Sequence, residues 1–320
     1  MRALILAVSL ALVVTGCKKP DFRYEIVYVN SYHQGYPPSD AVMQAMLRDL
    51  PADTFKITSF FMDTKRKSDS ASIELVVTEI LHSVGEIDPD MIIVSDDAAV
   101  KYLISQNLPQ LDMPIVYCGV NWSTASYSLD KADVTGMVEV LPLKEMLSFL
   151  QDQSTGHRTL AILSENSVSE KQNSLLLDTL YRTMGFTPEY FLVDNFQSWK
   201  ENFSELNQKF DVIYLPTNGA ISGWKDDEAR KWVGQHIRVP VFTCDDFMMP
   251  YAAVGFTKIP EEHGEYVSRT ARRILTNKTS IRELKEEKNK LFKVFINVPL
   301  SERLNLAIPD SLMLNATQIK

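Results

Sequence analysis

The 320-residue chain has few cysteines, few histidines and no excess of positive charge. Its three cysteines form no CxxC pair, and its five histidines show neither an HxH nor an HExxH spacing, so we expect no metal site. No glycine-rich phosphate loop is present, which argues against a nucleotide-binding protein, and we expect no cofactor. The net charge of −8 and the pI near 5.3 argue against a nucleic-acid partner, which would require a basic surface.

What the sequence does contain is typical of a globular protein. Hydrophobic residues make up 45% of the chain and aromatic residues 10%, so global disorder is not expected. The chain is longer than one hydrophobic core usually supports, and we therefore expect two domains. Short apolar runs alternate with helical patterns along residues 23–297, which predicts an α/β protein with parallel sheets and helices on both faces.

The first 16 residues have the pattern of a processing signal. Arg2 precedes an apolar segment over residues 3–14, which is too short to span a bilayer comfortably. This segment ends in Thr15-Gly16-Cys17, which resembles the bacterial lipobox, where the cysteine is lipidated. We predict a lipoprotein signal peptide over 1–16, a lipidated tether over 17–22, and a lipid-anchored protein of the cell envelope, at the periplasmic face of a membrane in a Gram-negative host. The alternative is an ordinary secretory signal.

Two stretches in different halves of the chain have the same form. Residues 91–99, MIIVSDDAA, and residues 211–220, DVIYLPTNGA, each place an apolar strand before a polar turn. Each is followed by a strand that ends in a cysteine, MPIVYC at 113–118 and VPVFTC at 239–244. This repeated order predicts two similar α/β lobes that face each other. A disulfide between Cys118 and Cys244 would cross the cleft and lock it, so we expect buried thiols.

Five segments, in order, are NSYHQGYPPSD (30–40), IIVSDDAA (92–99), VYCGVN (116–121), VTGMVEV (134–140) and FINVPLSERLNLAIPDSLM (295–313). Together they resemble the ABC-transporter substrate-binding protein family, in the group that includes the tryptophan- and tyrosine-binding lipoproteins. The first four resemble in particular its branch fused to sensor kinases and cyclases, and the last resembles the end of the family's sequence. The resemblance covers nearly all of the chain after the signal and implies the type 1 periplasmic binding protein fold, with two Rossmann-like lobes joined by a hinge. We expect the N-terminal lobe to hold residues 23–141 plus about 257–291, and the C-terminal lobe residues 142–256 plus about 292–320.

The turn after the strand at 91–95 supplies the first candidate ligand-binding residues. Ligands of open α/β sheets bind outside the carboxyl ends of the strands, where Asp96 and Asp97 are expected to lie. A carboxylate there can hold an ammonium or hydroxyl group of a ligand, or can cap the following helix. We expect one aspartate to face the cleft and the other to cap. Ser95 can donate to a ligand oxygen, and Ser31, after the first strand, is a further candidate.

Two further segments of the first lobe contribute candidates. Tyr32, His33 and Tyr36 are expected to line the wall of the first lobe by stacking or polar contact, and the alternative is a surface loop ordered by its own aromatic rings. Asn121 and Trp122 follow a glycine at a strand end, which slightly favours cleft lining over packing.

The second lobe departs from the family pattern. The family often has Pro-Thr-Asp at the turn where this chain has Asn218, so the identity of the ligand cannot be transferred. We expect Asn218 and Asp246 to bind ligand, followed by Thr217 and Asp245, and each has a turn or capping role as its alternative.

The resemblance implies a binding protein whose lobes close on a small ligand, an amino acid or a related amine-bearing compound, and which delivers it to an ABC permease. We expect a monomer without enzymatic activity. A sensory receptor that signals to a membrane kinase or cyclase is the alternative. A third hypothesis is a hydrolase that uses cleft carboxylates, but adjacent aspartates on one turn cannot both serve, and no nucleophile–base pair accompanies them.

Overall fold

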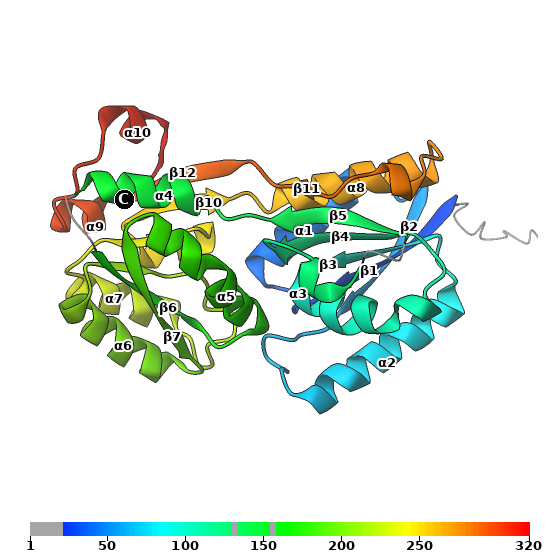
Figure 1. The fold of residues 1–320 in the computed structure, drawn as a ribbon, viewed down its shortest axis with the longest axis horizontal. Coiled ribbons are helices and arrows are strands. Elements are labelled where there is room, and N and C mark those ends of the chain that lie inside the picture. Colours follow the sequence, from blue (N-terminus) through cyan, green and yellow to red (C-terminus); the bar gives the residue numbers. More distant parts are fainter. Residues whose placement is uncertain (1–21, 130–132, 154–157) are drawn as a thin grey trace, which may run out of the picture.

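The computed structural model describes residues 22–129, 133–153 and 158–320 as two α/β lobes that lie side by side (Figure 1). The predicted fold of two lobes is confirmed. The predicted signal peptide and Cys17 lie outside the described residues. No described helix is both long and apolar enough to cross a membrane.

The N-terminal lobe is built on a six-stranded sheet in which every pair of neighbouring strands is parallel. In spatial order its strands are β11 (Glu287–Lys288), β5 (Val134–Glu139), β4 (Ile115–Asn121), β3 (Met91–Ser95), β1 (Tyr24–Asn30) and β2 (Phe55–Phe61). Its helical segments are α1 (Pro37–Asp49), α2 (Ser70–Ile87), α3 (Asp96–Ala98), the π-helix η1 (Ala99–Ser105), η2 (Leu108–Gln110), η3 (Ala125–Tyr127), α8 (Glu261–Leu275) and η5 (Ile281–Glu283).

The C-terminal lobe is built on a seven-stranded sheet. In spatial order its strands are β13 (Thr317–Ile319), β12 (Phe292–Asn297), β10 (Val254–Lys258), β9 (Val241–Thr243), β8 (Val212–Tyr214), β6 (Arg158–Glu165) and β7 (Phe186–Val193). Its helical segments are α4 (Leu143–Asp152), α5 (Val168–Thr183), α6 (Phe196–Lys209), α7 (Asp226–His236), η4 (Asp246–Tyr251), α9 (Val298–Arg303) and α10 (Asp310–Asn315).

One strand pair departs from the expected parallel arrangement, because β12 runs antiparallel to β10. The chain leaves β10 at the edge that faces the other lobe and passes to α8, which packs against α1 in the N-terminal lobe. It returns through β11 and enters β12 from the same edge, so β12 must run the opposite way (Figure 1). Segments after β5, after β10 and between β11 and β12 therefore join the lobes.

The two sheets repeat one strand order. Strands β2-β1-β3-β4-β5 of the first lobe correspond to β7-β6-β8-β9-β10 of the second. The paired sequence motifs form adjacent strands in each lobe, β3 with β4 and β8 with β9. Strand order reverses direction between β1 and β3 and between β6 and β8, and in open α/β sheets ligands bind at such points.

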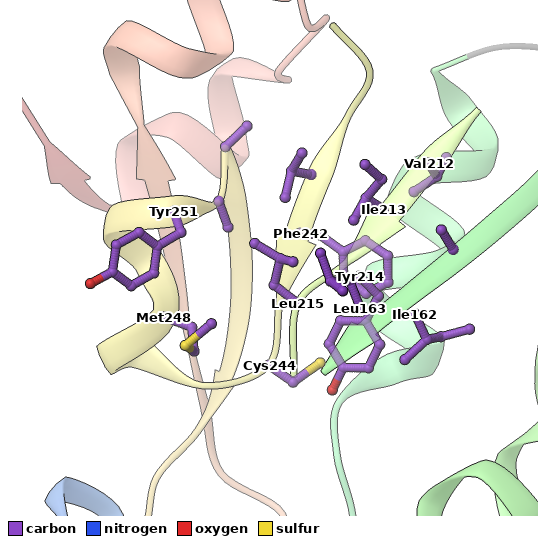
Figure 2. Packing of buried hydrophobic residues seen from close by; sticks show 14 of the residues in the cluster. Ile162, Leu163, Val212, Ile213, Tyr214, Leu215, Phe242, Cys244, Met248 and Tyr251 are labelled. Carbon is purple, nitrogen blue, oxygen red and sulfur yellow. The ribbon is translucent and has the colours of Figure 1, made fainter. Parts of the chain in front are cut away.

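The central strands are apolar because both of their faces are covered. Ile26, Ile92 and Ile93 are fully buried, as expected for central strands of a parallel sheet between two helical layers. In the second lobe the rings of Tyr214 and Phe242 stack at 4.6 Å between their centroids within the core shown in Figure 2. Cys118 and Cys244 are both buried and free, as expected.

Candidate ligand-binding site

A cavity lies between the lobes, at the carboxyl ends of the central strands of both sheets. Its free volume of about 40 Å³ has room for roughly three water molecules, so the side chains of the two lobes nearly fill the cleft. Its charged lining residues are Lys65, Asp96, Glu139, Glu170, Asp245 and Lys258. The lobes are therefore closed on a site that is rich in carboxylates.

Asp96 is the aspartate that faces this cavity. It begins α3 directly after β3 with a φ of 70°, a left-handed conformation that aspartate tolerates better than most residues. Gly119 allows its close approach, since a Cβ on Gly119 would lie 3.2 Å from Asp96 Oδ1. Burial, and then the nearby Glu139 carboxylate, raise the pKa of Asp96 to about 8. A cation brought into the cavity would stabilise its charged form.

Asp97 points away from the cavity into the first lobe and is fully buried. Its Oδ2 accepts from the Asn121 side chain at 2.5 Å and from the Asn121 backbone N–H at 3.3 Å, while Tyr127 Oη donates to Oδ1 at 2.8 Å. Burial nevertheless raises its pKa to about 6. Asp97 ties the start of α3 to the end of β4 and so positions its neighbour. The expected helix cap is not formed: Asp97 binds Asn121 and Tyr127 instead, and the start of α3 has no side-chain cap.

The two predicted serines hold the same turn in place. Ser31 Oγ donates to the Ser95 carbonyl oxygen at 2.7 Å and accepts from the Ala99 backbone N–H at 2.7 Å. It is fully buried and does not line the cavity. Ser95 does line it, and its Oγ lies 3.0 Å from Tyr28 Oη.

The loop after β1 places two of its three predicted residues in the cavity. Tyr32 and Tyr36 line it, with their ring centroids 5.2 Å apart in an edge-to-face arrangement. Lys65 Nζ lies 4.5 Å from the Tyr32 centroid and 4.9 Å from that of Tyr36, which places a cation against both rings. His33 lies outside the cavity, with Nδ1 3.6 Å from Asp63 Oδ1. Burial lowers the pKa of His33.

The side chains of Asn121 and Trp122 lie in different environments. Asn121 lines the cavity and orients its amide by donating to Asp97. Trp122 has a φ of 63°, which is unusual for a bulky residue, and packs against the hydrophobic core of the other lobe instead of lining the cavity.

In the second lobe the structure reverses the order of the candidates. Thr217 and Asp245 line the cavity, whereas Asn218 and Asp246 do not. Asp246 is exposed at the start of η4. Asp245 is buried, with Oδ1 3.3 Å from Lys258 Nζ, and burial raises its pKa to about 6. The neighbouring positions could not be ranked from the sequence because the turn decides which side chain points inward.

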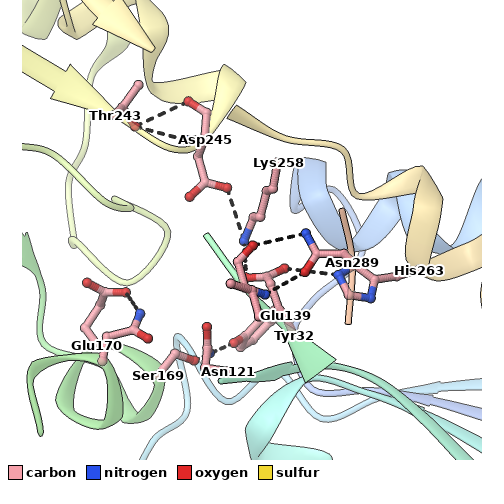
Figure 3. A network of polar contacts seen from close by, with 12 residues as sticks. Tyr32, Asn121, Glu139, Ser169, Glu170, Thr243, Asp245, Lys258, His263 and Asn289 are labelled. Carbon is pink, nitrogen blue, oxygen red and sulfur yellow. Dashed lines mark hydrogen bonds and ion pairs between the residues drawn. The ribbon is translucent and has the colours of Figure 1, made fainter. Parts of the chain in front are cut away.

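A buried ionic network joins the lobes on one side of the cavity (Figure 3). Lys258 Nζ lies 2.5 Å from Glu139 Oε1, in addition to its contact with Asp245. His263 is buried, with Nε2 3.6 Å from Glu139 Oε2, and burial lowers its pKa. The Asn289 side chain accepts from the Val140 N–H at 2.6 Å and donates to the Val140 carbonyl at 3.1 Å. These contacts tie together the segments that connect the lobes.

A second set of contacts closes the cleft directly. Lys65 of the first lobe forms a buried ion pair with Glu165 of the second, whose Oε2 also accepts from the Ala220 N–H at 2.6 Å. Tyr32 Oη and Ser169 Oγ lie 2.7 Å apart. Gly219 fits beneath the Tyr36 ring, because a Cβ there would lie 2.6 Å from Tyr36 Cε2 and 3.0 Å from Lys65 Cδ.

The sequence profile of the family described as ABC transporter substrate binding protein matches residues 41–320. The chain belongs to this family. Its members are extracytoplasmic solute-binding proteins rather than enzymes. A search of curated protein sequences found no match.

Solved structures of the same fold include three substrate-binding or related domains of low sequence identity. An ABC domain in complex with L-Trp, from Streptococcus pneumoniae, is 15% identical with a TM-score of 0.73, over 93% of this chain and 100% of that one. A conserved domain protein from Vibrio cholerae is 15% identical with a TM-score of 0.72, over 93% and 99%. A solute-binding protein from Clostridium phytofermentas with bound L-rhamnose is 12% identical with a TM-score of 0.59, over 88% and 98%.

Within the substrate-binding protein fold, several charged residues of the site were not among the sequence candidates. Glu139, Glu165 and Lys258 are the last residues of β5, β6 and β10. All three lie where ligands bind in open α/β sheets, at the carboxyl ends of strands, so the rule that predicts Asp96 also predicts them. Lys65 lies in the charged loop after β2, where no strand end marks it. Among the described residues no group of His, Cys, Asp and Glu is arranged to hold a metal ion.

Proposed function

We propose that this protein is a lipid-anchored, extracytoplasmic solute-binding protein that closes on a small amine-bearing ligand and delivers it to an ABC permease. The proposal rests on the position of Asp96. This residue lines the cavity and has no ion-pair partner among the residues that the structure describes. Asp96 is half-buried, and Lys258 and Lys65 lower its pKa only from a distance, without forming an ion pair with it. A ligand ammonium group beside it would stabilise its charged form.

The other charges of the cavity support a cationic ligand. Lys258 is engaged by Glu139 and Asp245, and Lys65 is engaged by Glu165. No lysine of the cavity is therefore free to attract an anion. The L-Trp of the Streptococcus pneumoniae complex carries an ammonium group, which supports an amine-bearing ligand; the carboxylate of an amino acid would have to bind uncharged donors here.

Closure is the step that would report an occupied site to the membrane partner. The contacts of Lys65 with Glu165 and of Tyr32 with Ser169 can form only when the lobes meet. A ligand that contacts both walls would favour this closed state, because ligand binding shifts the equilibrium toward the state it binds better. The permease would then bind the closed form. The lipobox at Thr15–Cys17 supports the anchor, and Cys17→Ser should release the protein from the membrane fraction.

The proposal is tested by calorimetric titration of the chain after Cys17 with amino acids, alkylamines and neutral sugars. Amines should bind, and Asp96→Asn should weaken their binding at least tenfold, because it removes the charge and keeps the shape. Asp246→Asn is the matched control, since this exposed aspartate lies close by in the second lobe but outside the cavity. Amine binding that is unchanged in Asp96→Asn would refute the assignment.

A further inference from the structure

The carboxylates around the cavity outnumber the lysines that neutralise them. Among the described residues, Lys258 pairs with Glu139 and Asp245, and Lys65 pairs with Glu165. Two carboxylates that line the cavity remain without an ionic partner in the described chain, Asp96 in the first lobe and Glu170 in the second. The proposed function assigns a ligand cation only to Asp96.

Glu170 lies in the first turn of α5. Ser167 caps this helix, because its Oγ accepts a hydrogen bond from the Glu170 backbone N–H at 3.3 Å. The Glu170 side chain lines the cavity and is buried. Figure 3 shows it away from Lys258, on the opposite side of the network. Burial, and then the nearby Glu165 carboxylate, raise the pKa of Glu170 to about 7. A cation beside Glu170 would favour its charged form, as at Asp96.

One further polar atom beside Glu170 lacks a hydrogen-bond partner among the described residues. Asn173 Nδ2 donates to Glu170 Oε1 at 3.0 Å, which leaves the buried Asn173 Oδ1 as an acceptor that receives no hydrogen bond. Asn173 lines the cavity. Buried polar atoms are usually satisfied, so an unpaired acceptor beside a carboxylate calls for a group with several N–H donors. Ammonium and guanidinium groups have this character.

The two unpaired carboxylates can be reached by one small molecule. α3, which begins with Asp96, packs against α5, which carries Glu170, and both residues line the same cavity. We infer that Glu170, together with Asn173, is a second cation-binding centre, and that the ligand carries two cationic nitrogen groups, one for each lobe. This inference rests on the proposed function, since it requires the first cation to bind at Asp96. A ligand of this kind would hold the lobes together by its two charges.

Matched pairs of compounds that differ mainly in a second ammonium group test the inference. The chain after Cys17 is titrated calorimetrically with 1,4-diaminobutane against 1-butylamine, and with L-lysine against L-norleucine. In the unaltered protein the second ammonium of at least one pair should improve affinity tenfold or more. Glu170→Gln should remove this gain while leaving the affinity for the compound with a single ammonium group unchanged, whereas Asp96→Asn should weaken the binding of every compound. Glu189→Gln is the control, because Glu189 is exposed on β7 of the same lobe.

The outcomes separate this inference from the proposed function. Equal affinity within both pairs would overturn the second centre and leave an amine site at Asp96 standing. If Glu170→Gln weakens the binding of both members of a pair equally, Glu170 has a structural role, and the second centre is also overturned. If none of the four compounds binds, the second centre and the amine site both fail. If Glu170→Gln does not fold, the paired affinities of the unaltered protein decide alone.

Discussion

The turns after β3 and β8 occupy the same place in the two lobes and serve different purposes. The turn after β3 directs a carboxylate, Asp96, into the cavity. The turn after β8 presents Gly219 to the Tyr36 ring of the other lobe, and its Ala220 N–H binds the Glu165 carboxylate that pairs with Lys65. One turn therefore contributes to the candidate ligand site, and the other receives the opposite lobe.

A repeated motif therefore predicts a location more securely than a role. Both motifs end at the carboxyl edge of a sheet, and both lie at a point where strand order reverses. The role then depends on what faces each turn across the cleft. Lys65 and Tyr36 lie opposite the β8 turn, and they leave room there only for a residue without a side chain.

The two turns should differ most in how much a substitution in each lowers the free energy of unfolding. Asp97→Ala leaves the Asn121 amide, the Asn121 N–H and the Tyr127 hydroxyl without their buried acceptor, which should lower the free energy of unfolding by about 3 kcal/mol. The counterpart in the other turn, Asn218→Ala, removes a half-buried side chain and should cost about 0.5 kcal/mol or less. Urea unfolding of both variants measures the difference. Equal losses would contradict the view that only the β3 turn depends on a buried polar anchor.

Much of the fold could be predicted because strand and helix periods are local. The strand expected at 91–95 is β3 with the same bounds, and the alternation of apolar runs with helical patterns is present along the chain. Helix α4 was not predicted, although Leu143, Met146, Leu147 and Leu150 repeat at helical spacing and are buried. The short strands β11 and β13 could not be predicted from local sequence, because pairing with distant strands defines them.

The site could be predicted only in part, because the direction of a side chain within a turn depends on contacts from elsewhere. The predicted candidates that line the cavity are Tyr32, Tyr36, Ser95, Asp96, Asn121, Thr217 and Asp245. Asp97 is drawn away by Asn121 and Tyr127, residues distant in sequence. The pairing of Lys65 with Glu165 spans 100 residues and both lobes, and no local pattern indicates it.

The second prediction adds one methyl group to the β8 turn. Gly219→Ala places a Cβ 2.6 Å from the Tyr36 ring only when the lobes are closed, so the protein should fold normally and resist closure. Ligand affinity should fall at least tenfold, and the decrease in radius of gyration on ligand binding, measured by X-ray scattering, should become smaller. Gly234→Ala is the matched control, because a Cβ at Gly234 on α7 of the same lobe would meet no atom within 4 Å outside the neighbouring backbone of its own helix. Equal closure in both variants would show that the Tyr36 contact does not limit it.

The smallest expected effect is a pH dependence of closure in the ligand-free protein. Closure buries Asp96 and Glu170, whose pKa values are raised to about 8 and about 7, and Asp245, whose pKa is raised to about 6. In an open cleft water reaches these carboxyls, and their pKa values return towards the ordinary value of about 4. Between these limits the closed form binds more protons than the open form, so raising the pH from 5 to 9 should shift the population towards the open form.

The other ionisable groups of the cavity do not reverse this sign. The pKa of Glu165 is lowered beside Lys65, the pKa of Lys258 is raised by Asp245 and Glu139, and the pKa of His263 is lowered by burial. Glu165 and Lys258 thus remain charged between pH 5 and 9. Burial of His263 acts in the opposite direction, but only near and below its ordinary pKa of about 6.5, so the carboxyls set the sign above that pH.

Measuring the radius of gyration as a function of pH compares the two turns directly. The β3 turn carries Asp96, whereas the β8 turn has no ionisable side chain at residues 217–220. Asp96→Asn should flatten the curve at its alkaline end, where Asp96 has the highest pKa of the three carboxyls. Asn218→Ala should leave the curve unchanged, since that side chain neither titrates nor lines the cavity. If Asp96→Asn does not change the dependence of radius of gyration on pH, another group titrates, and the β3 turn does not control closure.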